Sequence, residues 1–116
     1  MTDTEINATI AEKIFRWKST DGKAVRRSAS YDGPLLITPT GELDQPPNFC
    51  GNADASKMLR DRLAELAEGW MLIKLRNHSI GFAIRLLGAT ESIGADDEQE
   101  FKAVAKCAVL VAERMR

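Results

Sequence analysis

The chain has 116 residues, of which 44% are hydrophobic, and it carries 16 Lys and Arg against 17 Asp and Glu. This length holds one core of ordinary size, so we expect a single domain over residues 1–116. The formal net charge of -1 argues against a nucleic-acid module held by bulk positive charge and against an acidic disordered tail.

Residues 3–17 have the pattern of an amphipathic helix. Thr2 and Glu5 stand at the spacing of a capping box, in which each side chain bonds to the backbone N–H of the other residue. The apolar residues recur at helical steps: Ile6, Ile10, Ile14 and Trp17. This spacing places them on one face, which we expect to pack against the core.

The segment 18–50 is rich in turn residues. A weak strand is predicted at 24–27, and a short edge strand at 35–38, where prolines flank an apolar run. Residues 44–52 contain a Pro-Pro pair, and we expect them to cross the surface as extended coil. Whether 18–50 forms one strand, two or none stays open from the sequence.

A second helix is predicted over residues 54–68, where Gly69 ends it. The segments 70–76 and 79–87 then form the strongest predicted strand pair, an antiparallel hairpin. With residues 77–78 as a two-residue loop, Ile73 faces Phe82 and the apolar partners all share one face of the sheet. The other face is mixed and carries Trp70, Leu72, Lys74, Gly81, Ala83, Arg85 and Leu87.

Residues 88–95 are expected to form a loop, and residues 96–115 a third amphipathic helix. The predicted fold class is α+β. We expect a three-layer α/β/α sandwich, in which three helices cover both faces of a small, mostly antiparallel sheet with a central hairpin. An alternative places all the helices on one face of the sheet, which would leave Trp70 and Leu72 partly in water.

The chain has two cysteines, Cys50 and Cys107, and one histidine, His78. They are too few for a structural zinc site, and we expect no metal and no cofactor. Residues 1–5 lack the basic start and apolar stretch of a signal peptide, and no run approaches the ~18 apolar residues of a membrane span. We therefore expect a cytoplasmic protein with reduced thiols.

Three short stretches occur in a characteristic order. They are Asp3-Thr4-Glu5-Ile6-Asn7, Pro46-Pro47-Asn48-Phe49-Cys50 and Ala105-Lys106-Cys107-Ala108-Val109-Leu110. Together they resemble the small proteins of the bacteriophage ABA-sandwich family. The resemblance implies a layered α-β-α fold and an origin in a phage or prophage, in the cytoplasm of the bacterial host. It implies no activity, because none is established for the family.

Two side chains come into question for catalysis. His78 has an ordinary pKa suited to acid–base work, but its place at a hairpin tip favours a solvated turn residue. Cys50 stands near a helix start, which can lower a thiol pKa, although an inert buried thiol is the preferred interpretation. A hydrolase would need Cys50 and His78 in one pocket. We expect no catalytic residue and no enzyme activity.

Charged residues cluster at two places in the sequence. Residues 13–27 carry six cations and one acid, a pattern more typical of a solvated face than of a nucleic-acid site in a chain of neutral total charge. Weak nucleic-acid binding through 13–27 is the alternative hypothesis. Acidic residues in 91–100 are a candidate counterpart for these cations if the chain self-associates.

The leading hypothesis is a non-enzymatic phage or prophage accessory protein that binds another macromolecule. The expected partner is an unidentified protein or a second copy of the chain, and no membrane contact is expected. The residues expected to make this contact are Arg26, Arg27, Trp70, Leu72 and Arg85.

Overall fold

Short strands and three helices alternate along residues 1–115, which are the residues that the computed structural model describes. The helices are α1 (Asp3–Lys13), α2 (Ala53–Leu66) and α3 (Glu100–Arg114). The strands are β1 (Val25–Arg27), β2 (Asp32–Pro34), β3 (Leu36–Ile37), β4 (Leu43–Asp44), β5 (Ala67–Lys74), β6 (Ile80–Leu86) and β7 (Ile93–Asp97). The predicted α+β class, with three helices and small antiparallel sheets, is confirmed.

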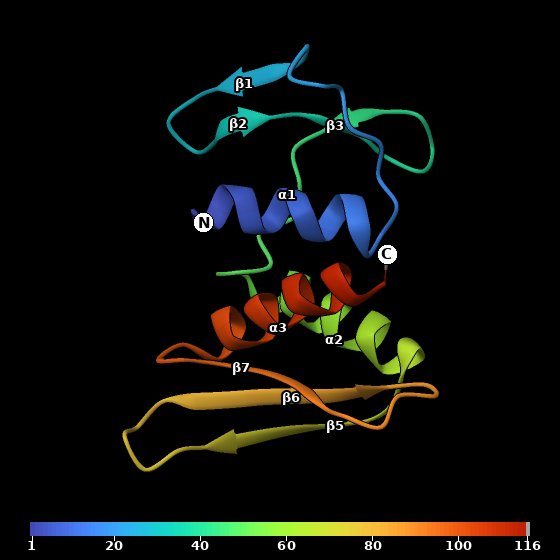
Figure 1. Cartoon of the computed structure of the whole chain (residues 1–116). Coiled ribbons are helices and arrows are strands. Elements are labelled where there is room, and N and C mark those ends of the chain that lie inside the picture. The colour runs from blue at the N-terminus through green and yellow to red at the C-terminus, as the bar shows by residue number, and fades with distance from the viewer. Residues whose placement is uncertain (116) are drawn as a thin grey trace.

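The helices lie between two β layers (Figure 1). Helix α3 packs on β6 and β7 with one side and on α1 and α2 with the other, and the hairpins β1–β2 and β3–β4 lie beyond α1. All three helices lie on the same side of the β5–β6–β7 sheet, which is the alternative arrangement that the sequence left open. The reason lies in α3, where only a narrow side with Lys106 and Glu113 is exposed and the buried residues cover the rest of the helix: Ala103, Val104, Ala105, Cys107, Ala108, Val109, Val111 and Ala112. Such a helix has to be covered on both sides.

Helix α1 begins as its sequence predicts. The Thr2 hydroxyl oxygen accepts from Glu5 N at 3.2 Å, and Thr2 N donates to Glu5 Oε1 at 3.2 Å, which completes the capping box. The helix ends at Lys13 instead of residue 17, because the chain turns at Arg16, whose φ is 63°. Trp17 therefore packs against the core from beyond the helix end.

Segment 18–50 forms four short strands in two antiparallel hairpins, β1–β2 and β3–β4. The predicted strands at 24–27 and 35–38 correspond to β1 and β3, and their partners β2 and β4 were not predicted. The prediction that 44–52 crosses the surface as coil is wrong at Phe49 and Cys50, which are fully buried. The ring of Phe49 stacks on Phe15, with centroids 5.4 Å apart, and this contact holds the segment in the core.

The β5–β6 hairpin exists, but its predicted register is wrong by one residue. Leu72 pairs with Phe82 and Ile73 with Gly81, so Ile73 and Phe82 lie on opposite faces. The loop has three residues instead of two, because Leu75 N donates to Ser79 O at 2.7 Å and His78 N donates to Leu75 O at 3.1 Å. This loop type ends in a left-handed residue, and His78 has φ 66°.

Residues 93–97 form the third strand of this sheet, where a loop and a helix start were predicted. Strand β7 pairs with β6, with Ile93 opposite Ile84 and Ala95 opposite Phe82. Helix α3 consequently begins at Glu100 instead of Asp96. Helix α2 is also shifted by one or two residues from the prediction, since the Asn52 side chain caps it at Ala55 N and the chain enters β5 at Ala67.

Candidate functional site

The β5–β6–β7 sheet has one covered face and one uncovered face. The inner face packs on α3 through Phe82 and Ile84, which are both 1% exposed. The register places the following residues on the opposite, outer face: Met71, Ile73, Leu75, Gly81, Ala83, Arg85, Gly94 and Asp96. No helix covers this outer face in the described part of the chain (Figure 1).

Apolar side chains are exposed on the outer face. Met71 is 58% exposed and Ile73 is 45% exposed. The residues opposite them are small, since Gly81 and Ala83 on β6 carry almost no side chain. They leave a shallow hollow of about 220 Å³, which Met71, Ile73 and Leu75 line on one side. The outer face therefore presents an apolar ridge beside a shallow depression.

The structure separates three residues that were predicted to share one interaction face. Trp70 and Leu72 lie on the inner face and Arg85 on the outer face. Leu72 is half-buried against the core, whereas Trp70 stacks on Phe82 at 5.8 Å between ring centroids and remains 51% exposed at the sheet edge. Arg85 Nη2 pairs with Glu68 Oε2 at 3.0 Å.

Sequence reasoning missed Met71 and Ile73 as surface residues. The signal that could have found them is the alternation of side chains along β5, which a shift of one residue in the register inverts. The predicted two-residue loop placed both side chains towards the core.

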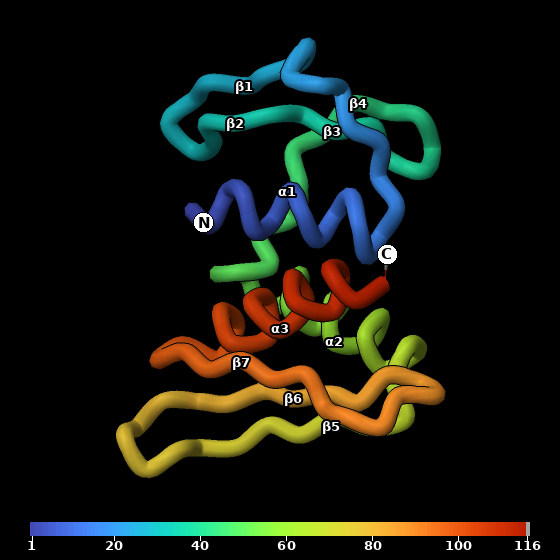
Figure 2. Tube along the Cα trace, in the orientation of Figure 1, coloured from blue at the N-terminus to red at the C-terminus, as the bar shows by residue number. Residues whose placement is uncertain are grey.

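Arg26 and Arg27 lie far from this sheet. They are exposed on β1, in the β layer on the other side of the helices (Figure 2). Arg26 Nη1 donates to Gln45 Oε1 at 3.2 Å, and Arg27 Nε lies 3.9 Å from Asp32 Oδ1. The structure therefore does not bring the predicted interaction residues together as one site.

Ion pairs within the chain engage two of the five acidic residues at 91–100, Asp97 and Glu100. Lys106 Nζ lies 2.6 Å from Asp97 Oδ2, and this hydrogen bond is the main cause of the lowered pKa of Asp97. Glu100 pairs with Arg60 at 3.3 Å. These carboxylates hold the helices and the sheet together, which weakens them as a counterpart for cations of a second chain.

Neither thiol has the properties of a nucleophile. Cys50 is 2% exposed, and burial raises its pKa to about 11. Cys107 is fully buried and burial also raises its pKa to about 11, so both thiols are protonated at neutral pH. His78 lies exposed in the β5–β6 loop. Residues 1–115 contain no group of three His, Cys, Asp or Glu that could hold a metal ion.

The three stretches that carry the family resemblance have structural roles. Asn7 Oδ1 accepts from Cys50 N at 3.2 Å, and Asn7 Nδ2 donates to Asn48 Oδ1 at 3.2 Å, so the first stretch is tied to the second. In the third stretch, Cys107 Sγ donates to Ile93 O at 3.4 Å, which joins α3 to β7. These residues connect elements of the core that lie far apart in the sequence.

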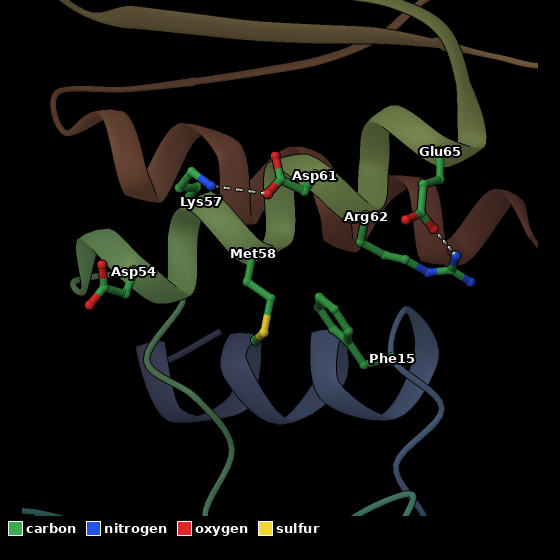
Figure 3. A pocket seen from close by; sticks show the side chains of 7 residues that line it. All are labelled: Phe15, Asp54, Lys57, Met58, Asp61, Arg62 and Glu65. Carbon is green, nitrogen blue, oxygen red and sulfur yellow. Dashed lines mark hydrogen bonds and ion pairs between the residues drawn. The ribbon is translucent and has the colours of Figure 1, made fainter.

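A second concave surface lies between the end of α1 and the side of α2 (Figure 3). Phe15, just beyond the end of α1, and Met58 from α2 point into this groove of about 350 Å³. Its rim carries two ion pairs, Lys57 with Asp61 at 3.5 Å and Arg62 with Glu65 at 2.6 Å. The groove is open and combines few apolar side chains with charges that are already paired.

The architecture defines an α+β protein with three helices between small antiparallel sheets. It is similar to the crystal structure of a phage protein from Bacillus cereus ATCC 14579, with a TM-score of 0.68 over 98% of this chain and 89% of that chain, at 17% sequence identity. At this identity the likeness establishes the fold. The sequence itself matches no protein-family model and no curated protein.

The chain therefore shares its fold with a known phage protein. Within residues 1–115, none of the helices combines the length and the apolar character that crossing a bilayer requires.

Proposed function

We propose that this chain is a phage or prophage accessory protein, located in the cytoplasm of the bacterial host, that binds another protein and catalyses no reaction. The similarity to a phage protein supports the phage origin. The observation that carries the binding role is the exposure of Trp70, Met71 and Ile73 on one strand, β5.

Single exposed apolar residues are common on protein surfaces, but their concentration is informative. The described residues include nine large hydrophobic side chains that are exposed, and four of these belong to the segment 70–87: Trp70, Met71, Ile73 and Leu87. A sheet face that stays exposed to water normally carries polar side chains. The outer face departs from this pattern at Met71 and Ile73, which favours burial against a partner.

Site-specific photo-crosslinking in the bacterial host tests this proposal. A photoreactive residue in place of Met71 is expected to form an adduct with a defined polypeptide, which mass spectrometry identifies. Met58, 43% exposed on α2, is the matched control position and is expected to form none. Adding Ile73→Lys should abolish the adduct from position 71. Equal adducts from both positions, or none from position 71, would contradict the proposal.

Weak nucleic-acid binding is the second candidate function. It is favoured by the exposure of all six cations of segment 13–27: Lys13, Arg16, Lys18, Lys23, Arg26 and Arg27. Fluorescence anisotropy with a labelled oligonucleotide at low salt is the appropriate measurement. Binding should weaken as salt rises, and the double substitution Arg26→Ala and Arg27→Ala should reduce the salt dependence. A flat anisotropy curve at low salt would dismiss this candidate.

A further inference from the structure

Strand β5 has a free edge. The strand order β5-β6-β7 leaves β5 paired on one side only, and no other described strand approaches its second side. Leu75 is hydrogen-bonded to Ser79, and in an antiparallel pair every second residue of a strand bonds to its neighbour. The backbone N–H and C=O groups of Trp70, Leu72 and Lys74 therefore point away from β6, to the free edge. Three successive outward-directed residues form a template for an additional strand.

The charges along β5 distinguish between the two ways of adding an identical strand. Glu68, which also pairs with Arg85 of its own chain, stands near the beginning of the strand, whereas Lys74 stands at its end and Arg76 just beyond it. A parallel copy would set like charges side by side, which is unfavourable. An antiparallel copy sets Glu68 of each chain beside the cationic end of the other. The charge pattern therefore favours antiparallel self-pairing.

The exposed side chains determine the register of such a pair. With a two-fold axis at Leu72, Met71 of one copy lies opposite Ile73 of the other, so the two exposed large apolar side chains of the outer face cover each other. Trp70 then lies opposite Lys74, where the ammonium group can contact the indole ring. An axis at Met71 would set Ile73 opposite Gly69, and an axis at Ile73 would reach into the loop at Arg76.

We propose that the partner is a second copy of this chain, whose β5 pairs antiparallel with β5 about a two-fold axis at Leu72 to make a continuous six-stranded sheet. This assignment rests on the proposed function, because it names the protein that β5 binds. The two-fold arrangement closes on itself, since each copy uses its β5 edge once.

Light scattering and sedimentation of the purified full chain provide the first test. The expected mass is twice that of one chain, with dissociation on dilution. Lys74→Pro removes an outward N–H at an edge position that tolerates proline, and symmetry removes it twice, so Kd should rise about tenfold or more. Lys74→Ala keeps the N–H and is the matched control, with Kd expected within about threefold of the native value.

Disulfide formation between two variants tests the register independently of the proline. Met71 and Ile73 of the two copies would form a pair without mutual hydrogen bonds, whose Cα separation of about 4.5 Å suits a disulfide. With oxidised glutathione as the oxidant, a mixture of Met71→Cys and Ile73→Cys chains should therefore crosslink faster than either variant alone. The native thiols of Cys50 and Cys107 are buried and do not compete. Faster self-crosslinking of Met71→Cys would overturn the axis at Leu72.

The outcomes separate this inference from the proposed function. A chain that stays monomeric up to about 1 mM, with no crosslink between the two cysteine variants, overturns self-pairing. If Met71 still photo-crosslinks to a different polypeptide in the host, the binding role stands with another partner. Absence of every adduct from position 71 overturns both. If the circular dichroism spectrum of Lys74→Pro shows that this variant does not fold, crosslinking between the two cysteine variants becomes the test of self-pairing.

Discussion

Asn7 joins helix α1 to the segment that leads into α2, and we predict that Asn7→Ala destabilises the fold strongly. Asn7 is 7% exposed, and its Oδ1 accepts from the backbone N–H of Cys50, which is itself 2% exposed. Removing the acceptor leaves that N–H without a partner away from water, which costs about 1–3 kcal/mol. Loss of the contact with Asn48 adds up to about 1 kcal/mol. We expect a total of about 2–4 kcal/mol.

Urea unfolding measures this change, with Trp fluorescence and far-UV circular dichroism as two probes of the transition. Asn48→Ala is the matched control, because Asn48 is exposed and water can replace its contact with Asn7. Its expected cost is below about 1 kcal/mol. An Asn7→Ala variant within about 0.5 kcal/mol of the native chain would refute the reasoning, and so would equal costs for the two substitutions.

Three further predictions concern backbone strain, a buried hydroxyl and the thiols. His78→Gly should raise the unfolding free energy by about 0.5–1 kcal/mol, because His78 has φ 66°; Asn77→Gly, with no positive φ to relieve, should not. Ser56 Oγ is buried without a hydrogen-bond partner among the described residues, so Ser56→Ala should stabilise by about 1 kcal/mol in urea unfolding, and a loss of stability would show that the hydroxyl is bonded. Burial raises the pKa of Cys50 and Cys107 from 9.0 to about 11, so between pH 9 and pH 11 the unfolded chain binds fewer protons than the folded chain. Stability should therefore fall as the pH rises through this range, less steeply in Cys107→Ala, and at pH 8 a thiol reagent should react with both thiols only after unfolding.

Local signals in the sequence predicted several elements well. The Thr2–Glu5 capping box starts α1 where it was predicted, because its two hydrogen bonds involve residues only three positions apart. The predicted apolar stripe of α3 is also confirmed, because Val104, Ala108 and Val111 are buried. These features depend on neighbours along the chain, which the sequence displays directly.

Features that depend on distant partners were predicted less well. The exposure of Met71 and Ile73 follows from a single left-handed residue, His78, which lengthens the loop and shifts the register by one. Only a few per cent of residues other than glycine adopt a positive φ, so the sequence carried little warning. Strand β7 was missed for a similar reason, because Ile93 and Ala95 form a strand only where β6 offers them an edge.

The predicted family motifs illustrate why a resemblance can define a fold and leave the function open. Asn7, Phe49 and Cys107 make contacts between elements that are far apart in the sequence, so they help determine which elements pack together. None of them reaches the outer face of the β5–β6–β7 sheet. A residue on the outer face that selects a partner can therefore change without disturbing these core contacts.

The layer order explains why the outer face is left uncovered. Helix α3 is enclosed by the sheet on one side and by α1 and α2 on the other, and the β1–β2 and β3–β4 hairpins cover α1 (Figure 1). No described element remains to cover Met71 and Ile73. A sheet face that this fold leaves to solvent would be expected to carry polar side chains, as Arg85 and Asp96 do. The apolar residues at 71 and 73 are therefore the part of the surface that the fold itself does not explain, and the proposed pairing of β5 with a second copy would bring them together.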